Sequence, residues 1–600
     1  MIGSITSTPS TGPTSSSTTT ISCSSSGMRQ HQIGNETMNQ VFGYQCLPGD
    51  SPAGEIVFAK AQPIALSCFE GAPPPQLRLF TQAHTTLHTT VSQEHGTYVY
   101  VWGIPVHPQI ESSAIPSWCS RVIAEQRYER FRELLGPFVV VMDDPKTQRV
   151  IFVTDILGIR PFFWGQPQGR LVFGSAVWPL QQAGLSQGEC NYDALSAWIA
   201  YGYNCTDGTL FSDLHRFPPG SVTMFQGGRC TAIPYARFAA QDRSGTIDRL
   251  ADDIQEMVSA ATQTILSRHT PVSIAFSGGY DSRYLLALAL SSLPKDAIIC
   301  ATVEGDRKEA RIARQVAETL DIPLQRYPVP GAVWDLYEEV YHFTPDGFPI
   351  TKFFPYLIAR QFPGVPMLNG FFGDALIRAS RDQFQGKYET EWEGDWADTL
   401  QRKYLVVKPE VMQIWFRPEM IKRIMKRSHR PMEEAVQRGK AVGKVFLWTK
   451  FYYSHPRKVA NNFLQHLDLS EALLPFYQWA LLSYRMAHAY GTLSREVYTR
   501  IFHRYFSTIA HIPHSSDVSP SRRHPSPVAR CIKTWSRQLL PVMCQKQSLS
   551  LLDKKRAIPL TVAGMAGSQR VEGSIRHFYR LYVLEKRLRD AGLDFAWEEI

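Results

Sequence analysis

The chain has 600 residues, of which 44% are hydrophobic and 20% charged, and it carries a formal net charge of +9. This length suffices for two or more domains with cores of ordinary size. No apolar run approaches the ~18 residues of a membrane span, and the amino terminus lacks the basic and apolar regions of a secretory signal. We therefore expect a cytoplasmic protein without membrane contacts.

Cysteines and basic residues point to no further class. The ten cysteines are far apart, with no close pairs at metal-ligand spacing, which argues against a zinc site or a disulfide scaffold. Small basic clusters, such as Arg522-Arg523 and Lys554-Lys555-Arg556, are typical of a solvated face. No aromatic-basic motif accompanies them, so we expect no nucleic-acid partner.

Residues 1–37 form a Ser/Thr-rich tract with too little apolar surface to fold, and we expect a disordered leader. Met28 and Met38 are alternative starts to Met1. From 38 to 235, short alternating runs broken by Gly, Pro and Asp predict a mostly β domain. The predicted strands are Gln40–Tyr44, Tyr98–Trp102, Phe138–Met142, Val150–Val153 and Leu171–Phe173.

From 236 to 515, strands alternate with helices, which predicts a parallel sheet with crossover helices. The predicted elements are the helices Ile247–Leu266, Tyr284–Leu290 and Glu309–Leu320 and the strands Val272–Phe276 and Ile298–Val303. Helical patterns between 390 and 510 predict a helical flank. Residues 516–600 are expected to be a linker, with its Ser/Pro/Arg-rich part at Ser515–Pro527, and a C-terminal helical segment at Ser574–Ala591.

The clearest chemical motif is Ser277-Gly278-Gly279-Tyr280-Asp281-Ser282, between a predicted strand and a predicted helix. Two glycines let the backbone approach a ligand, and the helix start attracts negative charge. Asp281 is of a type that holds the magnesium of a nucleotide. An ordinary tight turn explains paired glycines alone, but the strand, the acid, the hydroxyl and the helix together favour a phosphate-binding loop.

These residues resemble the loop of the ATP pyrophosphatases, which split ATP into AMP and pyrophosphate, and in particular that of the asparagine synthetase family. Other matches, in order and spacing, lie upstream, at Asp155-Ile-Leu-Gly158-Ile-Arg160-Pro161, Leu171-Val-Phe-Gly174-Ser175, Leu210-Phe211 and Arg216-Phe217-Pro218-Pro219-Gly220. The resemblance implies an α/β protein: an N-terminal-nucleophile-like αββα sandwich (38–235), then an adenine-nucleotide α-hydrolase-like parallel-sheet domain (236–515) with a helical flank.

The segment Leu368-Asn369-Gly370-Phe371-Phe372-Gly373-Asp374 is similar to the second signature of that family. The resemblance makes Asp281 and Asp374 the magnesium ligands, since magnesium prefers oxygen donors and shares them with phosphates. It implies ATP and Mg2+ as cofactors. The implied ATP-binding residues are Ala275, Ser277, Gly278, Gly279, Asp281, Ser282, Val303, Asn369 and Gly370.

The chain departs from the glutamine-hydrolysing members at its amino terminus. Those members need a cysteine as first residue, whose free amine serves as base for its own thiol. This chain has no Met-Cys start, and Cys46 follows the first predicted strand, where a structural role is expected. The glutamine-binding segment has only Val101-Trp-Gly-Ile-Pro105 as its counterpart. We therefore expect an inactive glutaminase domain, as in beta-lactam synthetases and lasso-peptide cyclases.

Two groups of the synthetase chemistry also differ. Phe371 stands where asparagine synthetase has a glutamate, and phenylalanine cannot move a proton. The lysine that relatives place near Ile512–Asp517 is missing, which leaves His511, His514 and Arg522-Arg523 as substitutes, although a solvated surface also explains each. The candidates to accept the proton of the attacking amine are His342, Tyr341 and a group on the substrate.

Three interpretations follow. The first is an amide-forming ligase that adenylates a carboxylate, either aspartate or a specialised small-molecule or peptide substrate, and transfers it to an amine or ammonia. The second is an altered pseudoenzyme that serves as a nucleotide-binding or scaffold protein, and the magnesium pair argues against it. The third, a tRNA- or nucleotide-modifying pyrophosphatase, conflicts with the amino-terminal matches. The sequence leaves a homodimer open.

Overall fold

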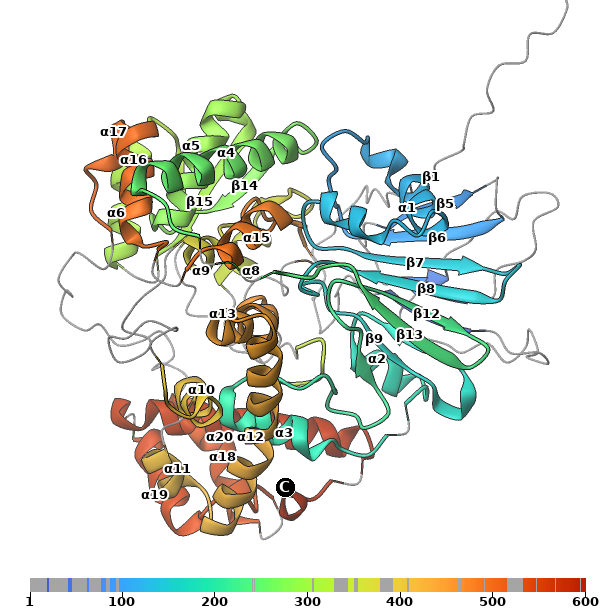
Figure 1. Cartoon of the computed structure of the whole chain (residues 1–600). Coiled ribbons are helices and arrows are strands. Elements are labelled where there is room, and N and C mark those ends of the chain that lie inside the picture. Colours follow the sequence, from blue (N-terminus) through green and yellow to red (C-terminus); the bar gives the residue numbers. More distant parts are fainter. Residues whose placement is uncertain are drawn as a thin grey trace, which may run out of the picture.

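A computed structural model describes most of the chain from residue 96 onward and short segments before it (Figure 1). It describes residues 19–20, 41–45, 62–63, 77–81, 87–92, 96–186, 188–239, 241, 243–304, 307–327, 344–349, 354–377, 392–406, 409–461, 467, 469–489, 492–514, 532–545, 548–566, 568–593 and 595–600. Within these ranges, no helix combines the length and the apolar character that crossing a membrane requires. The fold is mixed α/β, with parallel and antiparallel sheets.

Two antiparallel sheets form what we call the antiparallel-sheet region. The larger has the strand order β1-β5-β6-β7-β8-β12-β13 and the smaller the order β11-β9-β10-β2-β4-β3. The strands are β1 (Thr19–Thr20), β2 (Val41–Gln45), β3 (Gln62–Pro63), β4 (Leu77–Thr81), β5 (Leu87–Ser92), β6 (Thr97–Trp102), β7 (Val139–Asp144), β8 (Arg149–Thr154), β9 (Phe163–Gly165), β10 (Val172–Gly174), β11 (His215–Arg216), β12 (Ser221–Gln226) and β13 (Arg229–Pro234).

Strand β7 shows how these sheets are layered. Val139 and Val141 pack in the core between the two sheets, whereas Val140 and Met142 pack in a larger core with Trp118 of helix α1 (Ile115–Ala124). The alternation follows from the two-residue period of a strand. Helix α2 (Val177–Gln182) packs against β10 of the smaller sheet, so the layers run helix, sheet, sheet, helix.

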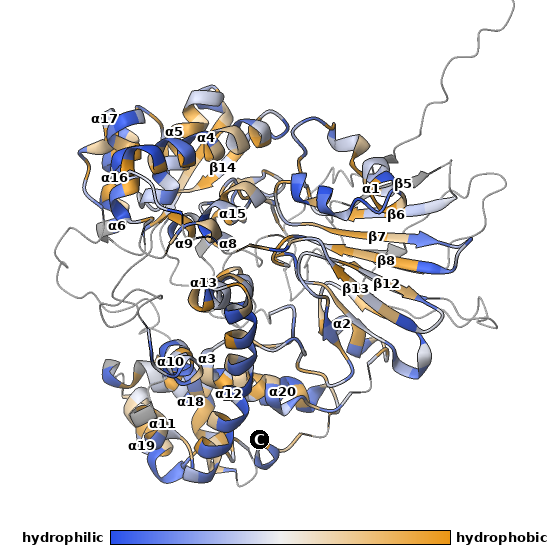
Figure 2. Ribbon diagram, in the orientation of Figure 1, coloured by the Kyte–Doolittle hydropathy of each residue, from blue (hydrophilic) through white to orange (hydrophobic). Residues whose placement is uncertain are grey.

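The expected strands of this half occur in β2, β6, β7, β8 and β10, and Figure 2 shows how hydrophobic β7 and β8 are. The tract expected to be disordered differs at Thr19–Thr20, which pairs with β5. Threonine favours strands, and an edge strand offers unpaired backbone groups. The rest of that tract and Cys46 lie outside the described residues.

A five-stranded sheet of order β16-β15-β14-β17-β18 forms the parallel-sheet region, and every pair in it is parallel, as the sequence predicts. Its strands are β14 (Val272–Ala275), β15 (Ile298–Val303), β16 (Leu324–Tyr327), β17 (Met367–Leu368) and β18 (Ala472–Leu473). The helices around it include α4 (Ile247–Leu266), α5 (Tyr280–Ser292), α6 (Arg307–Thr319), α8 (Phe354–Ala359), α9 (Gly373–Ile377), α15 (Trp479–Ala487), α16 (Arg495–Tyr505) and α17 (Ser507–Ala510).

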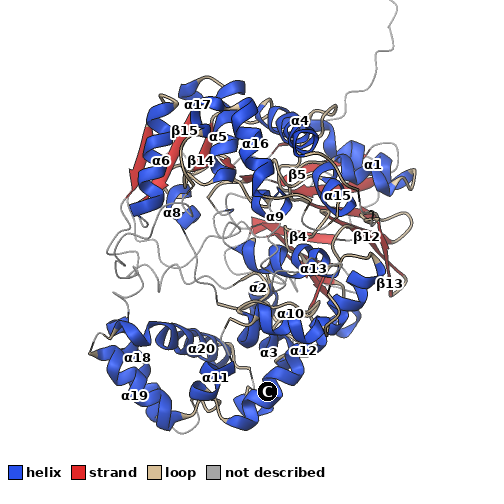
Figure 3. Cartoon of the chain, turned by 60° about the vertical axis from the view of Figure 1, so that its left-hand side comes forward, coloured by secondary structure: helices blue, strands red, loops and turns tan. Residues whose placement is uncertain are grey.

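The remaining helices gather below the two regions, where α3 (Tyr192–Tyr201) packs against α12 (Figures 1 and 3). They are α10 (Trp396–Tyr404), α11 (Pro409–Trp415), α12 (Pro418–Ala441), α13 (Val445–Thr449), the π-helical segment Lys450–Val459, α18 (Ile532–Cys544), α19 (Lys554–Met565) and α20 (Glu572–Asp590). Short 3-10 turns are Ser112–Ala114, Tyr128–Glu133, Pro167–Gly169, Lys295–Ala297, Gln569–Val571 and Trp597–Glu599.

The predicted last helix is α20, but the segment before it holds two further helices that the sequence analysis missed, α18 and α19. Each contains a proline, Pro541 in α18 and Pro559 in α19, and an interior proline normally interrupts a helix. The two helices pack closely on each other and on α20, and this tertiary packing outweighs local propensity. The linker expected at Ser515–Pro527 lies outside the described residues.

Candidate functional site

The turn between β14 and α5 is built around Gly278. This glycine has φ +74°, and a Cβ at its position would lie 2.7 Å from the backbone nitrogen of Ala313 on α6. Only glycine fits such an approach without strain. The Ser277 hydroxyl accepts a hydrogen bond from the Gly279 N–H at 3.2 Å and lies 3.2 Å from the Ser282 hydroxyl. Helix α5 then begins at Tyr280, with Gly279, which has no side chain to cap it, at its N-cap.

A second turn, from β17 to α9, lies against the first. A Cβ on Gly370 would meet the Cβ of Asp281 at 2.7 Å, and one on Gly373 would meet Asp281 Oδ1 at 2.5 Å. The two glycines therefore let the second turn touch Asp281. Between them, the Phe371 N–H donates to Asn369 Oδ1 at 2.9 Å, and Phe372 has φ +76°. The left-handed region is rare for a bulky side chain.

This contact brings the two acids expected to bind magnesium to one place. The Asp374 N–H donates to Asp281 Oδ2 at 3.2 Å. Asp281 is half-buried and Asp374 is exposed, and each follows the carboxyl end of a parallel strand. In open parallel sheets, ligands bind outside the carboxyl ends of the strands. The geometry is thus that of a candidate ligand site at the edge of the sheet.

Tyr498 of α16 also contacts Asp281, because its hydroxyl donates to Asp281 Oδ1. Burial raises the pKa of Tyr498 well above its usual value, and the negative charges of Asp281 and Asp374 raise it further. The phenol therefore stays protonated at neutral pH and remains a hydrogen-bond donor. Tyr498 is more than 200 positions from Asp281 in the sequence, and no motif marked it in advance.

The donors of this site fit magnesium that arrives with a nucleotide. The described residues contain no group of three or more His, Cys, Asp or Glu side chains that could hold a metal ion by themselves. Magnesium usually takes one or two protein carboxylates and completes its shell with water and phosphate oxygens. Asp281 and Asp374 supply such a pair. Whether they bind the metal stays a prediction.

A buried arginine fastens the first turn to the segment after α17. Arg283 is 1% exposed and donates to the carbonyls of Gly278 at 2.9 Å, Ile512 at 2.8 Å and Pro513 at 3.2 Å. The next residue, His514, stacks on Tyr280 with ring centroids 4.5 Å apart. A Cβ on Gly279 would lie 4.0 Å from His514 Nε2.

Among the groups suggested as substitutes for the missing lysine, the structure brings His514 to the turn. His511 is exposed. Arg522-Arg523 lie outside the described residues, as do His342 and Tyr341, the residues suggested for the proton of the amine. An imidazole N–H beside the amino end of a helix is in a position to donate a hydrogen bond to a phosphate that binds there.

The residues expected to hold adenosine lie along the same sheet edge. Ala275 ends β14 and Val303 ends the neighbouring β15, and both pack against one small core cluster. The Asn369 N–H donates to the Leu473 carbonyl at 2.9 Å, which fixes the start of the second turn. These three positions and Gly370 thus lie at the ends of the strands that precede the two acids or of a neighbouring strand, but no contact identifies adenosine.

Phe371 has no group that could take up or release a proton, and it packs among other rings. It is buried, and its ring packs against Phe372 at 4.5 Å and His455 at 6.2 Å between centroids. Burial, with a smaller effect of the Lys450 charge, lowers the pKa of His455 to about 3. His455 is therefore neutral at physiological pH and a weak base.

In the antiparallel-sheet region, the segment expected to be the counterpart of the glutamine-binding segment, Val101–Pro105, is closely packed at Gly103. Gly103 has φ +112°, and a Cβ there would lie 2.7 Å from the Pro137 carbonyl oxygen and 3.0 Å from Arg160 Nε. The Arg160 guanidinium lies 4.4 Å from the centre of the Trp102 ring and forms a buried ion pair with Glu471.

A family model matches part of the antiparallel-sheet region. Residues 121–236 match the family model of the glutamine amidotransferase domain. The chain is 23% identical over 164 residues to asparagine synthetase [glutamine-hydrolyzing] 3 of Bacillus subtilis, covering 27% of each chain. It is 23% identical over 214 residues to the amidase chry2 of Gibberella zeae, covering 32% of this chain and 31% of that protein.

The matches thus span about a third or less of these curated relatives. Among solved structures, glutamine phosphoribosylpyrophosphate amidotransferase from B. subtilis aligns at a TM-score of 0.19 and 10% identity, over 49% of this chain and 61% of that one. A likeness at that score supports no inference. The segment 121–236 is amidotransferase-like, and the comparisons carry the resemblance to asparagine synthetase at low identity.

Proposed function

We propose that the protein is an ATP-dependent carbon–nitrogen ligase. It adenylates a carboxylate, releases pyrophosphate, and transfers the acyl group to an amine or to ammonia. The observation that carries this proposal is the meeting of Asp281 and Asp374, from two glycine-containing turns, at the carboxyl ends of β14 and β17. The similarity to a named asparagine synthetase supports amide chemistry. ATP, Mg2+ and a small-molecule or peptide carboxylate complete the proposal.

In the first step, a carboxylate oxygen bonds to the α-phosphorus of ATP while the bond to pyrophosphate breaks. When bound, magnesium would neutralise charge on the departing pyrophosphate. The chain holds this group with the backbone of Gly278 and Gly279 and the first turn of α5, whose dipole favours anions. His514, held against Tyr280, adds a nitrogen donor on the same side. Such preorganised donors act on charge without reorganising.

In the second step, the amine nitrogen bonds to the acyl carbon, AMP leaves with the bonding electron pair, and the amine loses a proton. Phe371 has no group that accepts this proton. His455, which packs on it, is a weak base because burial lowers its pKa to about 3. We therefore assign the proton to a group of the substrate or to solvent.

We further propose that the antiparallel-sheet region does not hydrolyse glutamine. Arg160 and Glu471 neutralise each other in the core, and Arg160 covers the Trp102 ring instead of facing solvent. The counterpart of the glutamine-binding segment is thus packed against a buried ion pair. Glutamate release by the purified protein above background would contradict this part of the proposal.

A nucleotide-binding scaffold without turnover is the second candidate. It is favoured by one observation: protein donors, Tyr498 and the Asp374 N–H, occupy both carboxylate oxygens of Asp281. A metal would have to share or displace these donors. Nucleotide binding without pyrophosphate release would support the scaffold.

The test is release of pyrophosphate and AMP from ATP and Mg2+, with aspartate, other amino acids and peptides screened as carboxylate donors. Asp281→Ala and Asp374→Ala should each lower release by at least about a hundredfold, because each removes charge that neutralises the transition state. Asp398→Ala is the matched control, since Asp398 is a half-buried acid on α10 paired with Arg402. Unchanged release in either site variant would remove that residue from the site.

A further inference from the structure

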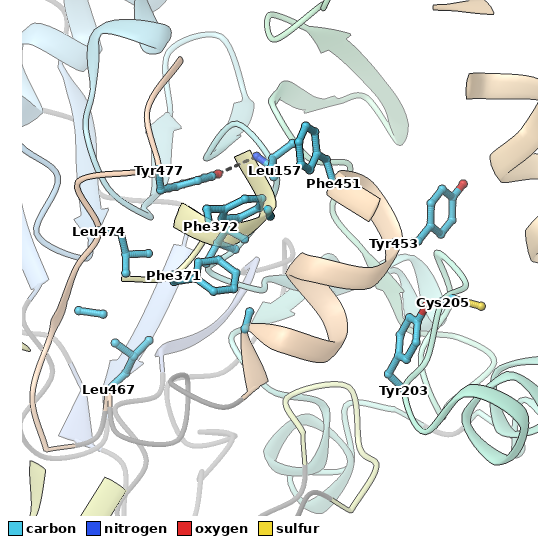
Figure 4. Packing of buried hydrophobic residues seen from close by; sticks show 14 of the residues in the cluster. Leu157, Tyr203, Cys205, Phe371, Phe372, Phe451, Tyr453, Leu467, Leu474 and Tyr477 are labelled. Carbon is cyan, nitrogen blue, oxygen red and sulfur yellow. Dashed lines mark hydrogen bonds between the residues drawn. The ribbon is translucent and has the colours of Figure 1, made fainter. Parts of the chain in front are cut away.

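Tyr477 lies at the junction of the two sheet regions. It follows β18, and only 1% of its surface is exposed. Its hydroxyl donates to Asp155 Oδ1 and accepts a hydrogen bond from the Leu157 N–H at 2.8 Å (Figure 4). Tyr477 therefore belongs to the parallel-sheet region by sequence but completes a turn of the antiparallel-sheet region.

That turn is built around the buried carboxylate of Asp155. The N–H groups of Ile159 and Arg160 donate to its two oxygens at 2.8 and 2.9 Å. Burial raises the pKa of Asp155, and the hydrogen bond from Tyr477 acts in the opposite direction. A buried carboxylate needs such donors, because leaving it unpaired is costly. The Tyr477 hydroxyl is thus fixed in place by a rigid partner.

The ring of Tyr477 reaches the site. It stacks on the ring of Phe372 with centroids 5.6 Å apart and an angle of 22° between the planes (Figure 4). Phe451 and His455 of the neighbouring helical segment pack on Phe372 from other directions, at 5.8 and 5.2 Å. Phe372 is 3% exposed and has φ +76°, which a bulky residue holds only when its surroundings impose it.

The conformation of Phe372 sets the direction of the chain at Asp374. The Phe372 carbonyl accepts from the Leu376 N–H at 2.9 Å and so begins α9. Two residues later, the Asp374 N–H reaches Asp281. A change of φ at Phe372 would therefore rotate the segment that carries Asp374 away from Asp281.

A second link ties the same two segments. The side chains of Arg160 and Glu471 pair just before β18, and the Glu471 carbonyl accepts from the Met367 N–H at 2.8 Å. Strand β17, which leads into the second turn, thus pairs with β18. Residues on both sides of β18 bond to the segment 155–160: Glu471 before it and Tyr477 after it. The contacts form one continuous packed path from Asp155 to Asp374.

We infer that Tyr477 is a positioning residue: it holds Phe372 in its left-handed conformation against the Asp155 turn, and so keeps the turn that carries Asp374 in contact with Asp281. In this role the antiparallel-sheet region supports the site from behind. The consequence for ATP rests on the proposed function, but the effect on the turn at residues 369–377 does not.

The experiment is hydrogen–deuterium exchange of the full chain as wild type, Tyr477→Phe and Tyr235→Phe. Tyr235 is the matched control because its buried hydroxyl donates to the neighbouring Thr154 carbonyl at 2.7 Å, and its ring packs on Phe131. We expect exchange in 369–377 to accelerate on the order of tenfold in Tyr477→Phe, whereas Tyr235→Phe leaves it unchanged. Equal exchange in all three proteins would overturn the inference.

A rescue separates positioning from general destabilisation. Phe372→Gly adopts φ +76° without help, so Tyr477→Leu should raise exchange at 374–377 less in a Phe372→Gly background than in the wild type. Additive effects would show that Tyr477 does not act through Phe372. Binding of ATP and Mg2+ is measured on the same proteins: wild type that binds no ATP would refute the proposed function, while the exchange data would still decide the role of Tyr477.

Discussion

The antiparallel-sheet region and the parallel-sheet region place some of their polar and charged residues differently. In the first, Asp155 and Arg160 are 0% and 1% exposed, and both are bonded to the protein. In the second, Ser277 and Asp374 are exposed at the ends of strands. Buried charges are retained when they have partners, whereas exposed groups at a sheet edge are open to a solute.

The difference assigns separate roles to the two regions. The amidotransferase-like segment matches its family model at 121–236, and its residues Asp155 and Arg160 are buried and bond to Tyr477 and Glu471, on either side of β18. The parallel-sheet region brings together an exposed and a half-buried acid, Asp374 and Asp281, beside a glycine turn. The segment that matches the family model and the acids of the candidate site thus lie in different regions of the molecule, and variants of each region should behave differently.

The largest expected effect comes from breaking the buried pair between the regions. Arg160→Met leaves Glu471 buried without its partner, and the loss of stability should be about 3–5 kcal/mol. The measurement is the urea midpoint, compared between variants. Adding Glu471→Met should recover most of the loss, because well-packed apolar side chains often replace a buried ion pair at little cost. An unchanged midpoint in Arg160→Met would mean that this junction does not hold the regions together.

A smaller effect on stability is expected at low pH, through His455 beside the second turn. His455 has its folded pKa lowered to about 3 by burial, against about 6.5 in the unfolded chain. Between these values the unfolded state binds a proton that the folded state does not, so stability falls as pH falls below about 6.5. The loss that His455 contributes by pH 5 should be about 2 kcal/mol.

His455→Leu tests this contribution. The variant should lose less stability than the wild type between pH 6.5 and pH 5, measured by urea midpoints at each pH. His503→Gln is the control, since His503 is an exposed histidine on α16. Parallel pH profiles for His455→Leu and the wild type would show that His455 takes up its proton without unfolding.

The sequence predicts those parts of the fold that rest on local pattern. Helix α4 and strand β15 occur with the predicted bounds, because amphipathic spacing and an uninterrupted apolar run define them. Helices α18 and α19 were missed because each contains a proline that only packing tolerates. The parallel order of the sheet followed from the alternation of strands and helices.

In the candidate site, only the residues of the two short motifs, one in each turn, could be predicted from the sequence. Gly278 and Asp281 share a short motif, and the conformation of Gly278 fits the expected turn. Tyr498, Arg283 and Tyr477 act through contacts between segments hundreds of positions apart, except for the Arg283 bond to Gly278. Such contacts depend on tertiary packing, and a single sequence has no period or spacing that reports them.

The smallest predicted effect concerns the affinity of the candidate site for Mg2+. Tyr498→Phe removes the donor on Asp281 Oδ1 and leaves the ring stacked on Tyr280, at 5.4 Å between centroids. Asp281 should then bind Mg2+ several-fold more tightly in the presence of ATP, because one hydrogen bond of about 1 kcal/mol no longer competes. Calorimetric titration of MgATP gives the Kd.

Tyr284→Phe is the control, since Tyr284 is an equally buried neighbour whose hydroxyl donates to Gln255 at 2.6 Å. Weaker binding in Tyr498→Phe alone would show instead that Tyr498 orients Asp281 for the metal, and the two regions would then share one principle, a buried tyrosine that fixes a carboxylate.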